Sequence, residues 1–273
     1  MSSRNQLPAT AVNPPPRSDV LGAPVHIVGV EGVLRLMEAW IRERERTHWI
    51  AVTGSHGVLE AHKKPDFRAV LESADLSVPD GRWAARFAAY KMSCPTHQVR
   101  GADLLSAFCE LSSHQGYSNF FYGDTEQTLA AATARLTARH PGLKVVGTHS
   151  PPFRDLTAEE DALVVDMINR ADPDVLWVAL GLPKQERWIA AHCARLKTPV
   201  IVAIGAALKF HSGQVVPSPS WASRAGLEWF WRLLHEPRTV WRRAMIYGPQ
   251  FMALSSLEAI HHRLTKRSRR NPA

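Results

Sequence analysis

The sequence predicts an α/β protein with a Rossmann-like, mostly parallel sheet, helices on both faces of that sheet and a basic helical C-terminal appendage. Short apolar runs alternate with longer segments of helical spacing between about residues 33 and 208. The runs are apolar throughout rather than at every second position, which is typical of strands buried on both faces. Several runs end at a glycine immediately before a helical segment.

Each expected strand is one of the apolar runs, and each expected helix has apolar residues at helical spacing. The strands are expected at residues 48–54, 75–81, 119–124, 143–151, 174–181 and 199–208. The helices are expected at residues 33–46, 58–74, 101–116, 128–142, 157–171 and 184–196. Pro65 should interrupt the second helix because proline lacks an N–H donor. Thr157 and Glu160 have the spacing of a capping box, and Asp124 or Thr125 is expected to cap a helix.

The composition divides the chain into four parts. Residues 1–22 are polar and proline-rich and are expected to form a disordered tail. Residues 23–215 are expected to form a Rossmann-like domain, for which the motifs below predict catalysis, residues 216–255 a helical appendage that could face a membrane, and residues 256–273 a basic tail.

Cysteine content and hydropathy restrict the class of protein. The three cysteines are far apart and contain no C-x-x-C pair, so neither a disulfide framework nor a zinc site is predicted. This fits a reducing cytosol. The first twenty residues contain no apolar signal-peptide core, and no run of about 18 apolar residues occurs, so neither a secretion signal nor a membrane-spanning helix is expected.

The net charge of +8 is concentrated at the C-terminal end. Residues 221–273 contain ten Lys and Arg against three Glu, which accounts for nearly all of the excess. A segregated basic end indicates an anionic partner: a nucleic acid, an acidic membrane surface or a phosphorylated substrate. A nucleic-acid binder would explain this charge, but it would leave the polar strand-end motifs unexplained.

An amphipathic helix is expected within the basic segment. Leu227, Phe230, Trp231 and Leu234 have the i, i+3, i+4, i+7 spacing of one helical face, with arginines and tryptophans interleaved. A basic, tryptophan-rich amphipathic helix can lie in a membrane interface. The alternative is a helix whose apolar face packs on the core and whose arginines are solvated.

Polar residues follow three of the expected strands, where ligands bind in open α/β sheets. Asp80 in "VPDG" could act as a general base, or it could belong to a plain Pro-Asp-Gly turn. Thr53 and His56 in "TGSHG" could donate hydrogen bonds beside a helix N-terminus, or this stretch could be an ordinary capped loop. Lys184 and its neighbours in "LGLPKQER" raise the same pair of alternatives.

Other ligand sites are disfavoured. There is no G-x-G-x-x-G after a strand and no P-loop, so hydride transfer and ATP hydrolysis lose their usual support. Asp172 and Asp174 have the D-x-D spacing of some metal-dependent glycosyltransferases, but they precede a strand and should lie at the opposite edge. No metal and no cofactor are therefore expected.

In order and content, these motifs resemble the WecG/TagA/CpsF family, glycosyltransferase family 26. The resemblance covers roughly residues 25 to 251. The matching stretches are "VTGSHGVLEA", "ADLSVPDG", "VRGADLL", "FFYGD", "VVGTHSPPF", "LGLPKQERWIAAH", "IGAALKFHSG" and "WASRAGLEWFWRLLHEPRTVWRR". The last stretch and the P-K-Q-E-x-W-I motif are the most specific.

The resemblance implies a metal-independent enzyme. It would move a sugar from a UDP-sugar to a polyprenyl-diphosphate-linked saccharide at the cytoplasmic face of the membrane, where it would be peripherally bound, in the synthesis of bacterial surface polymers. It implies no nucleic-acid partner, and a homo-oligomer is compatible with the sequence. Asp80 matches the family's base, and Thr53 and Gln185 complete the implied catalytic set. The implied substrate-binding residues are Gly54, His56, Gly81, Arg100, Asp103, Tyr122, Gly123, Gly181, Pro183, Lys184, Glu186, Gly205, Ala206, Arg224, Arg232 and Arg238.

Three positions depart from the family pattern. Ser55 replaces the asparagine of many members, Gln98 replaces an arginine, and Lys209 replaces an aspartate. These changes lie near the implied sugar and phosphate sites. They affect the identity of the donor sugar more than the reaction class, and they leave open a scaffold protein that has lost activity.

Overall fold

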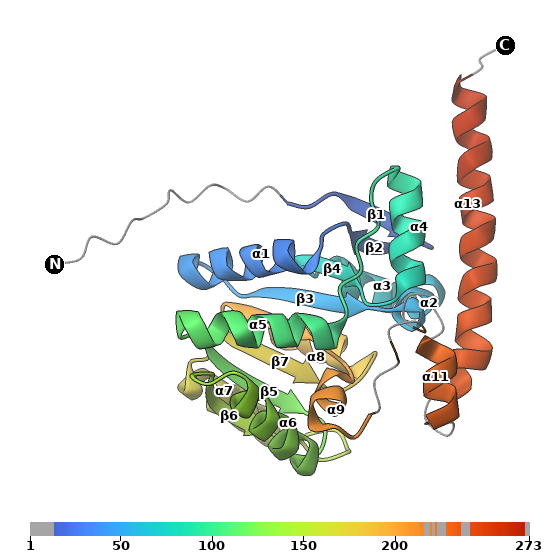
Figure 1. The fold of residues 1–273 in the computed structure, drawn as a ribbon. Coiled ribbons are helices and arrows are strands. Elements are labelled where there is room, and N and C mark those ends of the chain that lie inside the picture. The colour runs from blue at the N-terminus through green and yellow to red at the C-terminus, as the bar shows by residue number, and fades with distance from the viewer. Residues whose placement is uncertain (1–13, 216–218, 220–221, 223–227, 236–240, 271–273) are drawn as a thin grey trace.

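The computed structural model describes residues 14–215, 219, 222, 228–235 and 241–270. At its centre is a sheet of six strands in the order β4-β3-β8-β7-β5-β6 (Figure 1). Every neighbouring pair in this sheet is parallel. The strands are β3 (His48–Thr53), β4 (Leu76–Pro79), β5 (Ser118–Gly123), β6 (Lys144–His149), β7 (Val175–Ala179) and β8 (Val200–Ala203). The predicted fold class is confirmed.

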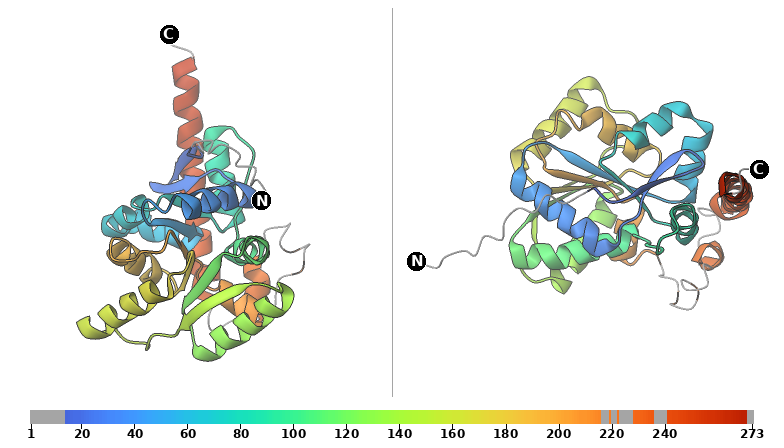
Figure 2. Two further views of the ribbon diagram at one scale, coloured as in Figure 1. Left: turned by 90° about the vertical axis from the view of Figure 1, so that its left-hand side faces the viewer. Right: turned by 90° about the horizontal axis from the view of Figure 1, so that it is seen from above.

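Helices cover both faces of the sheet (Figure 1 and Figure 2). One face packs against α1 (Val30–Glu43), α5 (Gly101–Gln115), α6 (Glu126–Arg139) and α9 (Ala207–Ser212). The other packs against α2 (Ser55–Lys63), α3 (Pro65–Glu72), α4 (Arg82–Met92), α7 (Ala158–Ala171) and α8 (Lys184–His192). Alternate strand residues serve the two faces: Trp177 contacts the first core, and Leu176 and Val178 contact the second. Both faces are buried, which explains the continuous apolar runs.

The local signals for helix ends are confirmed. Helix α2 ends at Lys63 and α3 begins at Pro65, as expected from the missing proline N–H. Thr125 caps α6 by accepting a hydrogen bond from Thr128 N, and Thr157 and Glu160 form the expected capping box of α7. These contacts involve residues only a few positions apart, so the sequence alone contains the information.

The predicted N-terminal tail is wrong for residues 17–22. Strands β1 (Arg17–Val20) and β2 (Ala23–His26) form an antiparallel hairpin. Leu21 and Gly22, in the two-residue turn, both have positive φ (51° and 81°), as the tight turns that match strand twist require. The hairpin buries Val20 and Val25 in the core on the α2–α4 side. This apolar content was hidden by the polar, proline-rich composition around it.

Two helices in the middle of the chain were not predicted. The first is α4, and the second is α9, which begins inside the strand expected over residues 199–208. Strand β8 ends at Ala203, and Gly205 then adopts a φ of +54°. This left-handed conformation turns the chain out of the sheet, so the apolar residues that follow pack as a helix instead.

The predicted boundary between appendage and tail at residue 255 is also wrong. A single helix, α13 (Gly248–Arg270), runs through it. Phe251 and Ser255, before the boundary, are buried, and Glu258, beyond it, accepts a hydrogen bond from Lys91 Nζ at 3.0 Å, so both sides of the expected boundary contact the body of the protein. Before it come α11 (Glu228–His235) and a π-helix, η1 (Arg243–Tyr247). In α11 the expected helix is present, but Phe230 and Leu234 are exposed rather than packed on a core.

Asp75 connects the segment before β3 to the start of β4. Its carboxylate contacts Arg46 and lies 3.2 Å from His48 Nδ1, and it accepts a hydrogen bond from Trp49 N at 2.9 Å. Burial alone would raise the pKa of Asp75, but the contacts with His48, Arg46 and Trp49 lower it from 3.8 to about 2. The unfolded chain therefore takes up this proton at a higher pH than the folded protein does.

The lowered pKa of Asp75 predicts a specific loss of stability in acid. We expect the ionised carboxylate to contribute about 1–2 kcal/mol to the free energy of unfolding. This contribution should be complete above the unfolded pKa of 3.8 and should disappear as the pH falls to about 2. Urea unfolding of the wild type and Asp75→Asn between pH 2 and 6 measures it. A stability difference that stays constant across this range would contradict the assignment.

Candidate active site

The carboxyl ends of β4, β3, β8 and β7 are neighbours, and most of the predicted site residues follow them. Thr53 ends β3, Asp80 follows β4 and Gly205 follows β8, while Gln185 lies in the first turn of α8 after β7. Asp80 N donates a hydrogen bond to Thr53 O at 3.1 Å, which joins two of these loops directly. Ligands of open α/β sheets bind at this edge.

The Asp80 carboxylate is held in one orientation. Its Oδ1 accepts a hydrogen bond from Gly101 N at 3.1 Å, at the start of α5. Its Oδ2 lies toward Gly54, where a Cβ would come within 3.8 Å of it. Among the described residues no hydrogen bond is made to Oδ2. One carboxylate oxygen is thus fixed by the backbone, and the other remains for a proton donor.

Gln98 also positions Asp80. Its Nε2 donates to Asp80 O at 2.7 Å, and the next residue, Val99, donates its N–H to Pro79 O at 2.9 Å. Gln98 is one of the three departures from the family pattern, and sequence reasoning left its effect open. In the structure it holds the backbone on which the carboxylate is carried.

Thr53 and His56 lie at the junction of β3 and α2. Thr53 is buried, and its Oγ1 has no hydrogen-bond partner in the described part of the chain. A buried hydroxyl without a partner is costly, so a ligand atom or water is its expected partner. Gly54 caps α2 without a side-chain hydrogen bond, so the first N–H groups of the helix face this edge. His56 is in that first turn.

Gln185 and Glu186 form a fixed pair at the start of α8. Gln185 Oε1 accepts a hydrogen bond from Gly205 N at 3.0 Å, and its Nε2 donates to Glu186 Oε1 at 2.9 Å. Both side chains are buried, Glu186 completely, and Glu186 Oε2 has no partner among the described residues. Burial raises the pKa of Glu186 because the charged form loses its hydration. Glu186 is therefore placed to orient the amide of Gln185.

The two sides of this edge are linked through backbone. Gly101, which binds Asp80, also packs against the residue that follows β8, because a Cβ on Gly101 would lie 3.0 Å from Ile204 O. Gly205, the next residue, binds Gln185. Asp80 and Gln185 are thus connected through two short backbone segments rather than through flexible side chains, which fixes their relative position.

Helix α8 also contributes side chains to a pocket outside this group. A pocket of about 430 Å³ lies on the β5–β6 side, and Tyr122, Lys184 and Trp188 are among its lining residues. Tyr122 is buried and packs on Trp188 with ring centroids 4.6 Å apart. The indole Nε1 of Trp188 has no partner within the described residues. Sequence reasoning missed Trp188, although its i+4 spacing from Lys184 places both on one face of the helix.

The glycines and other small residues predicted at the site have different structural roles. Gly123 has a φ of +117°, and a Cβ there would lie 2.6 Å from the carbonyl of Ala179, so it permits β5 and β7 to approach. Gly181 has a φ of +79° with nothing within 4 Å of a Cβ, so it leaves open space at the edge. Pro183 and Ala206 precede α8 and α9 as their N-cap residues, and Gly81 precedes α4 in the same way.

Of the other charged residues expected at the site, the structure describes the side chains of Arg100 and Asp103. Arg100 is the N-cap residue of α5 and pairs with Asp103 at 3.9 Å, and Asp103 is largely exposed. Arg224 and Arg238 lie outside the described residues. Arg232 lies in α11, but its side chain is not among the described ones.

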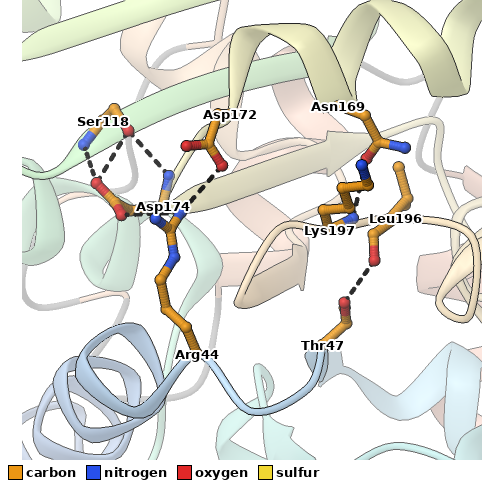
Figure 3. Close-up of polar contacts among 8 residues, drawn as sticks. All are labelled: Arg44, Thr47, Ser118, Asn169, Asp172, Asp174, Leu196 and Lys197. Carbon is orange, nitrogen blue, oxygen red and sulfur yellow. Dashed lines mark hydrogen bonds and ion pairs between the residues drawn. The ribbon is translucent and has the colours of Figure 1, made fainter.

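The acidic residues at the opposite edge have other partners (Figure 3). Asp174 Oδ2 accepts hydrogen bonds from Ser118 N at 2.8 Å and Ser118 Oγ at 2.9 Å. Arg44 Nη2 lies 3.2 Å from Asp172 and 3.5 Å from Asp174. Both aspartates therefore precede β7 at its amino end, as expected, where they hold neighbouring segments together.

The described residues contain neither a metal-binding cluster nor a helix suited to crossing a membrane. No group of three or more His, Cys, Asp or Glu side chains in that part of the chain is arranged to hold a metal ion. No helix there combines the length and the apolar character that crossing a membrane requires.

Comparison with known proteins identifies relatives along most of the chain. The model of the family described as "Glycosyl transferase WecG/TagA/CpsF family" matches residues 18–268. A protein of Bacillus spizizenii (strain ATCC 23059 / NRRL B-14472 / W23), named N-acetylglucosaminyldiphosphoundecaprenol N-acetyl-beta-D-mannosaminyltransferase, is 31% identical over 71% of this chain and 72% of its own. Proteins of the same name from Bacillus subtilis (strain 168) and Staphylococcus aureus (strain MW2) are 28% and 27% identical. They match over 70% and 67% of this chain and over 72% and 69% of their own.

Proposed function

Because the chain belongs to the WecG/TagA/CpsF family of glycosyl transferases, we propose that it transfers a hexose or N-acetylhexosamine, such as ManNAc, ManNAcA or Glc, from a UDP-sugar. The acceptor would be a polyprenyl-diphosphate-linked saccharide used in bacterial surface polysaccharide synthesis. The acceptor class is supported by the curated relatives, which are named for transfer to N-acetylglucosaminyldiphosphoundecaprenol. The positions of Thr53, Asp80 and Gln185 at one edge of the sheet support a shared site for these three residues.

The observation that carries the proposal is the placement of Asp80. One oxygen is fixed by Gly101 N, and the other lies toward Gly54. A carboxylate held in this way can accept a proton from an acceptor hydroxyl. The hydroxyl of Thr53, which has no partner among the described residues, and the fixed amide of Gln185 would bind donor or acceptor oxygens on either side.

The proposed reaction is a single displacement. Asp80 Oδ2 takes the proton of the acceptor hydroxyl as its oxygen bonds to the anomeric carbon of the sugar. The bond from that carbon to the UDP oxygen breaks, and UDP leaves with the electron pair. Attack from the face opposite UDP inverts the anomeric centre, which gives a β-linkage from an α-linked donor.

Protein groups would balance the diphosphate charge without a metal ion. The first turns of α2 and α5 begin beside Asp80 and are capped without side-chain hydrogen bonds. Their N–H groups and helix dipoles favour an anion there. Arg224, Arg232 and Arg238 would add guanidinium groups from the appendage.

The acceptor lipid places the enzyme at a membrane surface, and α13 supports this part of the proposal. Its exposed apolar side chains, Leu257, Ile260 and Leu264, have the spacing of one helical face, and Arg263 and Lys266 lie beside them. Such a face suits peripheral attachment to an anionic bilayer. The helix extends beyond the rest of the body, so this face is accessible (Figure 1).

The proposal is tested by turnover. The full chain is incubated with a panel of UDP-sugars and a short-chain polyprenyl-diphosphate-linked N-acetylglucosamine, and UDP release and product mass are measured with and without EDTA. We expect product from one donor, in equal yield with EDTA, because fixed protein groups replace the metal. Dependence on a divalent ion would contradict the metal-independent part. Absence of both turnover and UDP-sugar binding would favour a scaffold that has lost activity.

A further inference from the structure

Tyr247 connects the C-terminal part of the chain to the proposed site. Its ring stacks on the imidazole of His56, with centroids 4.4 Å apart and planes at 17°. His56 lies in the first turn of α2, and Tyr247 is the last residue of the π-helix η1. π-Helical turns are rare and frequently lie at functional sites. No sequence motif links these two residues.

Tyr247 lies next to a segment that packs against the body of the protein. Three residues after it, Gln250 Oε1 accepts a hydrogen bond from Lys63 Nζ at 2.9 Å. The same ammonium lies 5.7 Å from the centroid of the Tyr247 ring. Phe251 is buried and packs edge-on against Phe87 with centroids 5.8 Å apart. These contacts fix the start of α13 on α2 and α4. The position of the Tyr247 ring beside His56 is therefore fixed by packing, which lowers the entropy cost of the contact.

Further along α13, a second set of contacts holds the helix against the body. Glu258 accepts hydrogen bonds from Lys91 Nζ at 3.0 Å and from Leu21 N at 3.1 Å. The β1–β2 hairpin and α4 thus bind α13 about two turns beyond Phe251. Because α13 is held at both points, loss of the Tyr247 ring alone should leave it docked.

His56 stands where a donor phosphate would bind. It follows Thr53, whose buried hydroxyl has no partner among the described residues, and Gly54, whose position faces Asp80 Oδ2. The N–H groups of the first turn of α2 add a local preference for an anion. The imidazole of His56, which is carried on this turn, would add a side-chain N–H donor for the same group.

We propose that Tyr247 is a positioning residue: its ring holds the His56 imidazole over the N-terminus of α2 for the diphosphate of the nucleotide donor. The inference rests on the proposed function for the presence of that donor. It assigns to the C-terminal segment a role within the donor site that is separate from membrane contact. Docking of α13 and the geometry of the donor loop are then coupled through a single ring pair.

The test is a double-mutant cycle on the full chain, with UDP as the probe and its Kd measured by calorimetry. Tyr247→Leu should weaken UDP binding roughly threefold to tenfold, the range expected for loss of one aromatic pair. Tyr247→Phe keeps the ring and should bind UDP like the wild type. In a His56→Ala background, Tyr247→Leu should cause no further loss. Met245→Ala, an exposed position on the same π-helix, is the matched control and should leave the Kd unchanged.

Each outcome is decisive. If Tyr247→Leu binds UDP as tightly as the wild type, or if its effect persists undiminished without His56, the inference is overturned. Equal thermal midpoints for Tyr247→Leu and Tyr247→Phe separate a lost contact from a loosened fold. Failure of the proposed function would look different, because the wild type itself would then not bind UDP.

Discussion

Replacing Asp80 by asparagine should lower kcat about 10²- to 10⁴-fold, the range of a lost general base. Asparagine can still accept the hydrogen bond from Gly101 N through its Oδ1, so the loop should keep its shape. The amide at the second position cannot take a proton from the acceptor hydroxyl. Binding of UDP should therefore change little while turnover falls.

The experiment compares Asp80→Asn with Asp172→Asn. Asp172 lies at the opposite edge of the sheet, where it contacts Arg44. Its replacement should leave kcat within a factor of two of the wild type, because the pair is exposed and far from the reacting groups. Transferase rates at saturating donor and the thermal midpoints of all three proteins are measured. An Asp80→Asn enzyme that keeps more than a tenth of the wild-type rate would sink the assignment of Asp80 as the base.

Gly123→Ala should be the most destabilising single change among the predicted site residues. Gly123 has a φ of +117°, and an added Cβ would lie 2.6 Å from both C and O of Ala179. These atoms are backbone in β7, so they can move only if two central strands separate. Backbone strain and overpacking together should cost about 3–5 kcal/mol of unfolding free energy.

Gly181→Ala provides the matched comparison. Gly181 also has a positive φ, +79°, but nothing lies within 4 Å of the added Cβ. Only the backbone preference is then lost, about 1 kcal/mol. Denaturant unfolding of both variants measures the difference between them. Equal losses would mean that the close approach of Gly123 to Ala179 is not what destabilises the protein.

The parts of this fold that the sequence predicted depend on short-range patterns. Apolar runs that are buried on both faces predicted the parallel sheet, and the six strands lie where the runs are. The break at Pro65 and the caps at Thr125 and Thr157 involve residues within one turn of each other. Strand ends indicated where Asp80, Thr53 and Gln185 would lie, because the carboxyl ends of parallel strands share an edge, and the family resemblance implied that they form one group.

The elements that sequence reasoning missed depend on contacts between distant segments. The hairpin of β1 and β2 lies in a stretch whose composition resembles a tail, and it is ordered by packing on α2–α4. Helix α13 contacts α4, far earlier in the chain, on both sides of the expected boundary, through Phe251 before it and Glu258 after it. The sequence showed an amphipathic appendage but could not show which surface would receive it.

By itself, then, the sequence determined the α/β class and placed Thr53, Asp80 and Gln185 at the carboxyl ends of its strands. Periodicity, capping and strand polarity are local properties, and they are encoded within a few residues of each other. Tertiary structure alone decided that Gln98 holds the backbone of Asp80, that Gly123 lets β5 approach β7, and that Tyr247 meets His56. Each of these is a contact between segments whose distance is set by the packing of the whole chain, and such packing leaves no local pattern to read.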